Sequence, residues 1–249
     1  MAKNAIESIS PEKVAPLIGK VRGANSCKYN RAAKLANQYT ELIEKFGRMA
    51  ERGNGLTEYS KLAICSAILL ETGMRIGNLE SAEGYITQPR PNSKIEPEFA
   101  QTYGLITLTS NMVEVKGKKV IFNFTGKARV ENQYEVSNPL VVKYLKQLKK
   151  VRENNQATDE PLFGISDYKL NKFIQTSVGK EYSAKDFRTM KANVTAIDIA
   201  LGTPKSSDNK TRFKKIIVET AEKLSHTPTV CKKSYLSPTV VHFMEIGKL

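Results

Sequence analysis

The feature that most constrains the fold is a helix-length segment that is apolar on nearly every face. Residues 62–70 read Leu-Ala-Ile-Cys-Ser-Ala-Ile-Leu-Leu. A helix that meets solvent keeps a polar stripe, so a helix without one lies inside the protein. Thr57 provides an N-cap before it and Gly73 a C-terminal stop after it. The sequence therefore predicts a central buried helix from Thr57 to about Thr72.

The N-terminal region is predicted to hold one further helix. Between residues 31 and 52, apolar side chains recur at steps of three and four, which is typical of an amphipathic helix: Leu35, Tyr39, Leu42, Phe46 and Met49. Residues 1–30 contain two prolines and two glycines and are predicted to form an irregular arm. We therefore expect residues 1–55 to be an N-terminal arm and helix, and residues 56–249 to be the main domain.

The rest of the chain combines a small β region with more helices. Four strands are predicted from apolar alternation and turn residues, with a tight turn at residues 125–129: 105–108, 112–115, 120–124 and 130–136. A long proline-containing loop at residues 87–102 precedes them. Five further helices are predicted from cap and proline signals or apolar spacing. Two have both ends predicted, at residues 167–178 and 228–234. The other three begin at Asn138, at residue 183, and between residues 206 and 208. The fold class is therefore α+β and mainly α, with a small antiparallel sheet.

The net charge of +14 is the first indication of function. Such an excess favours a polyanion, and nucleic acid is the first candidate because bound lysines and arginines release its counterions. A membrane surface is the rival, but no apolar run has transmembrane length and no export signal is recognisable, so we expect an intracellular protein that binds no membrane. The three scattered cysteines and two histidines lack metal-ligand spacing, so a metal-free, cofactor-free mechanism is expected.

Five polar side chains at the edges of separate elements are candidates for chemistry: Arg75, Lys127, Arg188, His226 and Tyr235. Three of them also have a structural interpretation. Arg75 could form an ion pair, Lys127 could be a solvated residue of a hairpin tip, and Tyr235 could be half-buried at a helix end. The basic faces at residues 143–150 and 210–215 could be solvated or could follow a phosphate backbone.

Together these residue types suit transesterification at a phosphodiester. A tyrosine hydroxyl can attack phosphorus, and arginines donate to the non-bridging oxygens. A lysine can protonate the leaving oxygen, and a histidine can stabilise developing charge. His226 and Tyr235 are nine residues apart, about 13 Å along a helix, so they need not touch to reach one phosphate.

The chain resembles the catalytic domain of type IB DNA topoisomerases of the bacterial and poxvirus-like form. The resemblance covers roughly residues 57–240 and rests on five segments in family order: Met74-Arg75-Ile76-Gly77-Asn78, Tyr103 to Leu108, Phe124-Thr125-Gly126-Lys127, Lys185 to Thr189, and His226-Thr227-Pro228 through Ser234-Tyr235. It implies Tyr235 as the nucleophile that forms a 3′-phosphotyrosyl bond and Lys127 as the general acid. Arg75, Arg188 and His226 would stabilise the transition state, and Lys185 and Asn193 would assist at the DNA.

The resemblance also implies the substrate and the rival functions. We expect a monomer that relaxes double-stranded DNA without ATP or metal. Tyrosine recombinases share the fold, but they carry a histidine where this chain has Lys185, and the strand at 103–108 also favours the topoisomerases. A non-enzymatic DNA-binding module would explain the charge but not five reactive groups. The family's β-rich N-terminal clamp domain is expected to be absent or replaced, since only about fifty residues precede the match.

Overall fold

The computed structural model describes the whole chain except residues 1–8, 20, 22–25, 54, 88–97 and 207. It divides into two compact units, residues 1–43 with 185–249 and residues 44–184. We call them the tyrosine unit and the hairpin unit, after Tyr235 and Lys127. The predicted boundary at residue 55 concerns a functional domain, and it stays a prediction.

The hairpin unit is organised around the predicted buried helix, α4 (Glu58–Thr72). The Thr57 hydroxyl accepts from the amide of Ser60, and Gly73 ends the helix with φ 65°. Eleven of the fifteen helix residues are buried, since α4 packs against α6 (Pro139–Asn154), α7 (Asp167–Ser177) and strand β5 (Val130–Val136). The prediction of a central, capped helix is confirmed.

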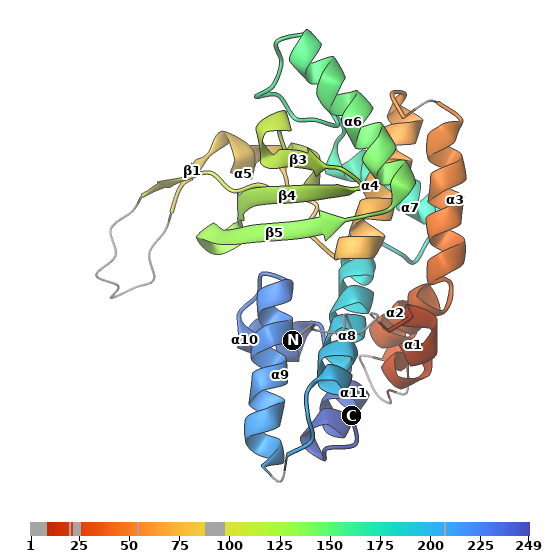
Figure 1. Cartoon of the computed structure of the whole chain (residues 1–249), viewed down its shortest axis with the longest axis vertical. Coiled ribbons are helices and arrows are strands. Elements are labelled where there is room, and N and C mark those ends of the chain that lie inside the picture. Colours follow the sequence, from red (N-terminus) through yellow and green to blue (C-terminus); the bar gives the residue numbers. More distant parts are fainter. Residues whose placement is uncertain (1–8, 20, 22–25, 54, 88–97, 207) are drawn as a thin grey trace. The chain divides into compact units, whose positions relative to one another are not determined.

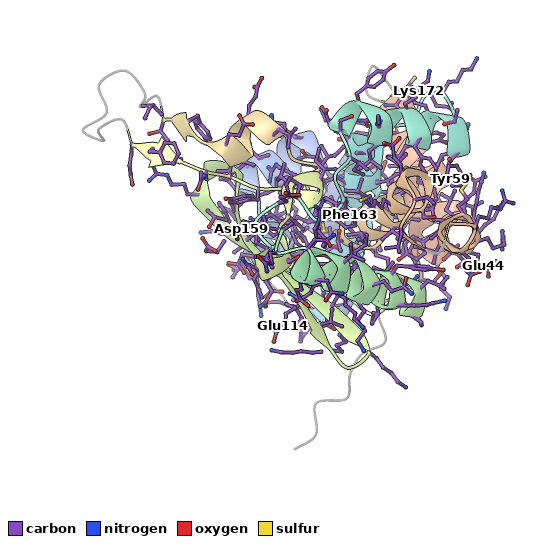
Figure 2. All side chains as sticks on the ribbon, turned by 90° about the horizontal axis from the view of Figure 1, so that it is seen from above. Glu44, Tyr59, Glu114, Asp159, Phe163 and Lys172 are labelled. Carbon is purple, nitrogen blue, oxygen red and sulfur yellow. The ribbon has the colours of Figure 1, made fainter. Side chains whose placement is uncertain are left out.

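A three-stranded antiparallel sheet covers part of α4 and α6. It contains β3 (Val113–Lys116), β4 (Lys119–Gly126) and β5 (Val130–Val136) in that order, with α6 beside β4 and α4 beside β5 (Figure 1). Val120, Phe122 and Phe124 alternate inward, as predicted. Figure 2 shows where side chains of this unit lie. The buried Phe163 is near the centre of the view, and the charged Glu114 and Lys172 are toward its edge.

The remaining elements of the hairpin unit are short. They are α5 (Leu79–Glu83), a two-stranded antiparallel pair β1 (Tyr85–Ile86) and β2 (Phe99–Ala100), and 3₁₀ turns at Leu105–Thr107, Ser110–Met112 and Lys127–Arg129. Strand β1 directly precedes the long loop predicted at residues 87–102, and β2 lies within it, so that part of the predicted loop is a strand. The middle of that loop, residues 88–97, lies outside the described residues.

One predicted strand is wrong. Leu105–Thr107 is a 3₁₀ turn, because the Thr107 hydroxyl accepts from the amide of Gly104 and donates to its carbonyl, which closes a tight loop. All four apolar and threonine side chains of residues 105–108 are buried. A short apolar run is compatible with a strand or a helical turn, and its burial alone does not distinguish them.

Among the residues that the structure describes, the tyrosine unit consists of helices and the loops that join them. Its helices are α1 (Pro11–Gly19), α2 (Ser26–Asn37), α8 (Ala184–Gly202), α9 (Asn209–Lys223), α10 (Pro228–Ser234) and α11 (Pro238–Glu245) (Figure 1). Thr227 caps α10 through the amide of Val230, with Pro228 in the first turn. The predicted bounds of α10 are confirmed.

Two predictions about the N-terminal region are wrong. Most of the supposed irregular arm that can be described is helical, since α1 buries Val14, Ala15 and Ile18 and tolerates Pro11 at its first turn. The single helix predicted over residues 31–52 is two helices, α2 and α3 (Tyr39–Glu51), which meet at Gln38. The three- and four-residue spacing runs on across the break, so apolar periodicity did not reveal it.

A fourth correction concerns the basic face predicted on α9. Arg212 is buried, and its guanidinium donates to main-chain carbonyls of Ala200, Thr203 and Pro204 at the end of α8. Five N–H donors allow arginine to satisfy several carbonyls at once. Arg212 therefore joins α8 to α9, and the exposed cations of this stretch are the lysines at 210, 214 and 215.

Candidate active site

In the tyrosine unit, three of the predicted site residues lie together. The Arg188 Nε donates to His226 Nε2 over 3.1 Å, and the His226 and Tyr235 rings lie 4.4 Å apart between centroids. The Arg188 guanidinium carbon lies 5.6 Å from the centre of the Tyr235 ring. The sequence required only that these groups reach one phosphate, whereas the structure places them in contact.

Helix α8 fixes Arg188. Its side chain is 3% exposed, and the guanidinium also donates to the carbonyl of Leu224, at the end of α9. Because a guanidinium only donates, His226 Nε2 acts as an acceptor in this contact, which puts the proton of a neutral imidazole on Nδ1. Arg188 is thus held by the segment that leads into α10.

The tyrosine lies just beyond the end of α10, in a turn whose backbone is held by α8. The buried amide of Asn193 donates to the carbonyl of Tyr235 over 2.9 Å and accepts from the amide of Ser237 over 2.7 Å. Asn193 also donates to Thr189 in its own helix. Asn193 is fully buried and contacts the backbone of Tyr235, whereas Lys185 at the start of α8 is exposed.

Cys231, one turn before Tyr235, is the other potential nucleophile of α10. Its side chain is fully buried, and burial raises the pKa of its thiol to about 11 while the Arg188 guanidinium opposes part of the rise. A thiol with that pKa is protonated near neutral pH and is a poor nucleophile. The half-buried phenol of Tyr235 is therefore the better candidate.

In the hairpin unit, one short segment supports both predicted residues. The amides of Leu105 and Ile106 donate to the carbonyls of Arg75 and Ile76, each over 2.9 Å. The neighbouring amide of Tyr103 donates to the carbonyl of Thr125, two residues before Lys127. The 3₁₀ turn that replaces the predicted strand therefore links the Arg75 segment to the hairpin.

Lys127 begins a three-residue hairpin loop. The pair Gly126–Val130 closes the loop, and Arg129 adopts a left-handed conformation with φ 58°, the position that such loops require at their end. The Arg129 guanidinium pairs with Glu98, 2.5 Å away, while Lys127 is exposed. Lys127 thus lies in the tight turn between β4 and β5 that the sequence predicts.

The Arg75 segment depends on a close approach of two glycines. A Cβ at Gly104 would lie 2.5 Å from the Gly77 nitrogen and 2.8 Å from the Arg75 carbonyl oxygen. Both obstacles are backbone atoms, which cannot rotate away. We expect Gly104→Ala to lower the free energy of unfolding by about 1–3 kcal/mol, as overpacking does.

Hydrogen exchange distinguishes this clash from a general loss of stability. In Gly104→Ala, the amides of Leu105 and Ile106 should lose protection because they donate to the Arg75 segment. Gly117→Ala is the control, since a Cβ there meets nothing within 4 Å although φ is +59°. Unchanged protection in Gly104→Ala would show that the two segments tolerate separation.

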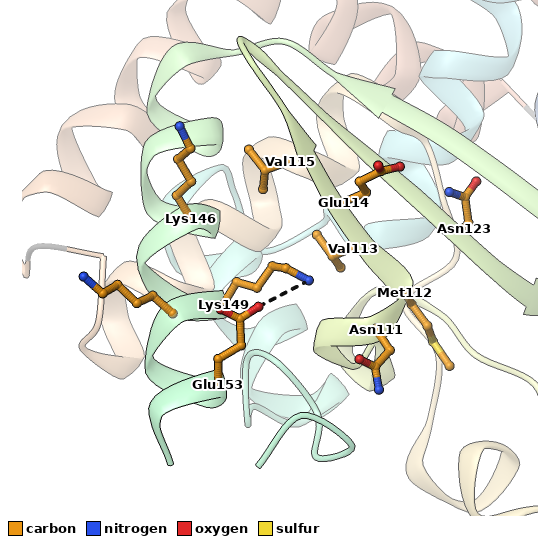
Figure 3. Close-up of a pocket in the computed structure, with 10 residues that line it drawn as sticks. Asn111, Met112, Val113, Glu114, Val115, Asn123, Lys146, Lys149 and Glu153 are labelled. Atoms are coloured by element: carbon orange, nitrogen blue, oxygen red, sulfur yellow. Dashed lines mark ion pairs between the residues drawn. The ribbon is translucent and has the colours of Figure 1, made fainter. Parts of the chain in front are cut away.

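The basic face predicted on α6 borders a hollow between that helix and β3 (Figure 3). Lys146, Lys149 and Lys150 line it with Glu114 and Glu153. The Lys149 ammonium donates to the carbonyl of Ser110, and its nitrogen lies 3.7 Å from a Glu153 carboxylate oxygen. Lys149 therefore has partners within the protein. Lys143, Lys146 and Lys150 are exposed, and they are the cations that a phosphate backbone could meet.

Sequence reasoning missed Lys28, on α2. Its ammonium donates to the carbonyl of Ser234, the residue before Tyr235, and lies 5.7 Å from the Tyr235 ring centre. The segment was interpreted as irregular, so no face was assigned to it. The signal that could have found it is the spacing of Lys28 and Arg31, one helical turn apart.

The fold is mainly α with a small antiparallel sheet, the class expected for the catalytic fold that type IB topoisomerases and tyrosine recombinases share. A model of the family described as eukaryotic DNA topoisomerase I, catalytic core, matches residues 20–245. The chain belongs to this family. The strand predicted at 103–108 was one argument for a topoisomerase over a tyrosine recombinase, and the structure has a 3₁₀ turn there instead. The distinction between the two classes therefore rests on the family match.

Viral topoisomerases are among the similar proteins. DNA topoisomerase 1B of Acanthamoeba polyphaga mimivirus is 28% identical over 233 residues, which cover 87% of this chain and 64% of that protein. DNA topoisomerase 1B of vaccinia virus (strain Copenhagen) is 29% identical over 154 residues, 58% of this chain and 46% of that protein. The matches thus span less than two thirds of the mimivirus protein and about half of the vaccinia protein.

Proposed function

We propose that this chain relaxes supercoiled double-stranded DNA as a type IB topoisomerase, through a transient 3′-phosphotyrosyl bond and without ATP or metal. The observation that carries the proposal is the contact of Arg188, His226 and Tyr235. A phenol beside a permanently charged guanidinium and an imidazole suits attack on an anionic phosphodiester. The family match agrees with this chemistry.

The proposed reaction exchanges one phosphodiester for another. The Tyr235 oxygen bonds to phosphorus, the bond from phosphorus to the 5′-oxygen breaks, and the phenolic proton is released. Lys127 gives a proton to the leaving oxygen, while Arg75, Arg188 and His226 stabilise the negative charge on the phosphate. After the cut strand rotates, the 5′-hydroxyl attacks the phosphotyrosine and restores both the DNA and the phenol, so no external energy is needed.

Asn193 and Lys185 have different parts in this proposal. Lys185 is exposed at the start of α8 and is available to DNA. Asn193 acts through the backbone that it holds on both sides of Leu236, and so keeps the tyrosine in place. We further propose that the chain acts as a monomer inside the cell. Among the described residues, no helix is long and apolar enough to span a membrane.

The test is relaxation of negatively and positively supercoiled plasmid in the presence of EDTA and without nucleotide. We expect both substrates to be relaxed. A tyrosine recombinase would instead join strands of two paired sites and relax plasmid weakly. Failure to relax either plasmid, or loss of relaxation on addition of EDTA, would contradict the proposal.

DNA binding is expected to depend steeply on salt. The exposed lysines on α6 and α9 would neutralise phosphates, and the logarithm of affinity then falls linearly with the logarithm of salt concentration. Lys146→Ala and Lys150→Ala should each reduce the slope by about 1 if the residue contacts a phosphate. Single-turnover cleavage at saturating DNA should change little.

Lys172→Ala is the matched control for these variants. Lys172 is also exposed, but it lies on α7 and outside both predicted basic faces. Its removal should leave the salt slope as it is. Equal slopes for all three variants and the wild type, measured by titration of a short duplex at several salt concentrations, would remove α6 from the DNA-binding surface.

A further inference from the structure

The turn that carries Tyr235 is held by side chains from two helices. Asn193 on α8 binds the carbonyl of Tyr235 and the amide of Ser237. From α2, near the N-terminus of the chain, the ammonium of Lys28 donates to the carbonyl of Ser234, where α10 ends. Carbonyls in the last turn of a helix have no partner within the helix, and a cation is favoured there. Lys28 therefore meets α10 at the residue before the tyrosine.

A second contact fixes α2 next to α8. Arg31 Nε donates to a carboxylate oxygen of Asp186 over 2.9 Å, and the Asp186 side chain is only 7% exposed. Asp186 lies two residues before Arg188. Lys28 and Arg31 are one turn apart and so share a face of α2. We call these two residues the α2 brace, because they join the two chain segments that carry Arg188 and Tyr235.

The ammonium of Lys28 is partly buried and lies near other charged groups. Burial lowers the pKa of its ammonium, and the positive charges of Lys185 and Arg31 lower it further, while Asp186 opposes them. The same ammonium lies 4.9 Å from the Tyr29 ring centre and 5.7 Å from that of Tyr235, within the range of a cation–π contact.

We propose that Lys28 is a positioning residue for the nucleophile: with its ammonium on the Ser234 carbonyl and close to the Tyr235 ring, it holds the tyrosine in its attacking orientation. This inference rests on the proposed function of Tyr235. It assigns a part in catalysis to the N-terminal helices, which the sequence interpretation treated as an arm outside the catalytic domain. Misplacing a reacting group by about 1 Å can cost roughly 10²-fold in rate, so a hydrogen bond one residue away can matter.

The competing role for Lys28 is a direct contact with a DNA phosphate. The two roles differ in what they change. A phosphate ligand contributes to affinity and to the salt slope, whereas a positioning residue changes the cleavage rate once DNA is fully bound. In the structure the ammonium binds a protein carbonyl, which favours positioning.

The experiment compares three variants of the full chain. Lys28→Met removes the charge and keeps the length, Lys28→Arg keeps a cationic donor, and Lys34→Met removes an exposed lysine from another face of the same helix. Each is measured for the thermal midpoint, for duplex affinity at several salt concentrations, and for single-turnover cleavage at saturating DNA. We expect Lys28→Met to cleave roughly 10- to 100-fold more slowly with nearly unchanged affinity, Lys28→Arg to recover most of the rate, and Lys34→Met to match the wild type.

Other outcomes overturn the inference in recognisable ways. Wild-type cleavage by Lys28→Met at saturating DNA, combined with a salt slope reduced by about 1, would make Lys28 a phosphate ligand. If Lys28→Met is too unstable to measure, Lys28→Gln takes its place. A rate that falls only in step with the thermal midpoint, with no recovery in Lys28→Arg, would show a structural role. If the wild type forms no covalent adduct, the proposed function itself fails; if it does and Lys28→Met equals it, only the role of Lys28 fails.

Discussion

Lys127→Ala is expected to slow single-turnover DNA cleavage by about 10²- to 10⁴-fold, the usual contribution of a general acid. The physical reason is the leaving group, since a 5′-alkoxide is too basic to depart near neutral pH without a proton. Lys127 is exposed at the start of a three-residue hairpin loop, so the truncation should leave the fold intact. The cleavage rate is measured on a short duplex that cannot be resealed.

A substrate with sulfur at the bridging 5′ position separates acid catalysis from charge stabilisation. A thiolate leaves without a proton, so Lys127→Ala should regain most of the wild-type rate on this substrate. Arg188→Ala is the matched comparison and should remain slow, because the role proposed for the guanidinium beside Tyr235 is to stabilise charge on the phosphate itself. Equal recovery of both variants, or of neither, would show that Lys127 is not the acid.

Tyr235→Phe is expected to abolish both relaxation and covalent attachment to DNA. The substitution removes one oxygen and leaves the ring beside His226, where the two centroids are 4.4 Å apart. DNA affinity and the thermal midpoint should therefore stay close to those of the wild type. Cys231 should not substitute for the missing phenol, because its buried thiol is protonated at neutral pH.

Two control variants accompany the Tyr235→Phe measurement. Tyr168→Phe removes the hydroxyl from an exposed tyrosine of α7 and should change neither relaxation nor covalent attachment. Cys231→Ala should retain covalent attachment, although loss of a buried side chain lowers stability. Residual attachment in Tyr235→Phe that disappears when Cys231 is also replaced would identify the thiol as a second nucleophile.

Local signals were strong enough to predict much of the secondary structure. Cap residues and a terminal glycine fixed α4, and a threonine–proline pair fixed α10. Alternation of apolar residues predicted β4 and β5. These features depend on the chemistry of a few adjacent residues, which a single sequence contains in full.

The errors occurred where distant residues decide the structure. The turn at Leu105–Thr107 is closed locally by Gly104 and Thr107, but hydrogen bonds to Arg75 and Ile76, some thirty residues earlier in the chain, hold it in place of a strand partner. Arg212 looked like a solvated cation because its carbonyl partners lie at the end of another helix. Neither set of partners can be read from local spacing.

The candidate site shows the same division. Residue type and order suggest the five candidate side chains, but the contact of Arg188 with His226 depends on the return of the chain after α9. The holding of the Tyr235 turn by Asn193 and Lys28 requires main-chain carbonyls as acceptors. Such acceptors carry no sequence signature, so the supporting contacts became visible only in the fold.

The most direct test of the central claim is to identify the bond between protein and DNA. The wild-type chain is incubated with a cleavable duplex in EDTA, the covalent adduct is digested with protease, and the attached peptide is sequenced by mass spectrometry. We predict one peptide, which carries the 3′-phosphate end of the cut strand on the oxygen of Tyr235. Attachment through another residue, attachment to the 5′ end, or an adduct that forms only when metal is added would contradict the account.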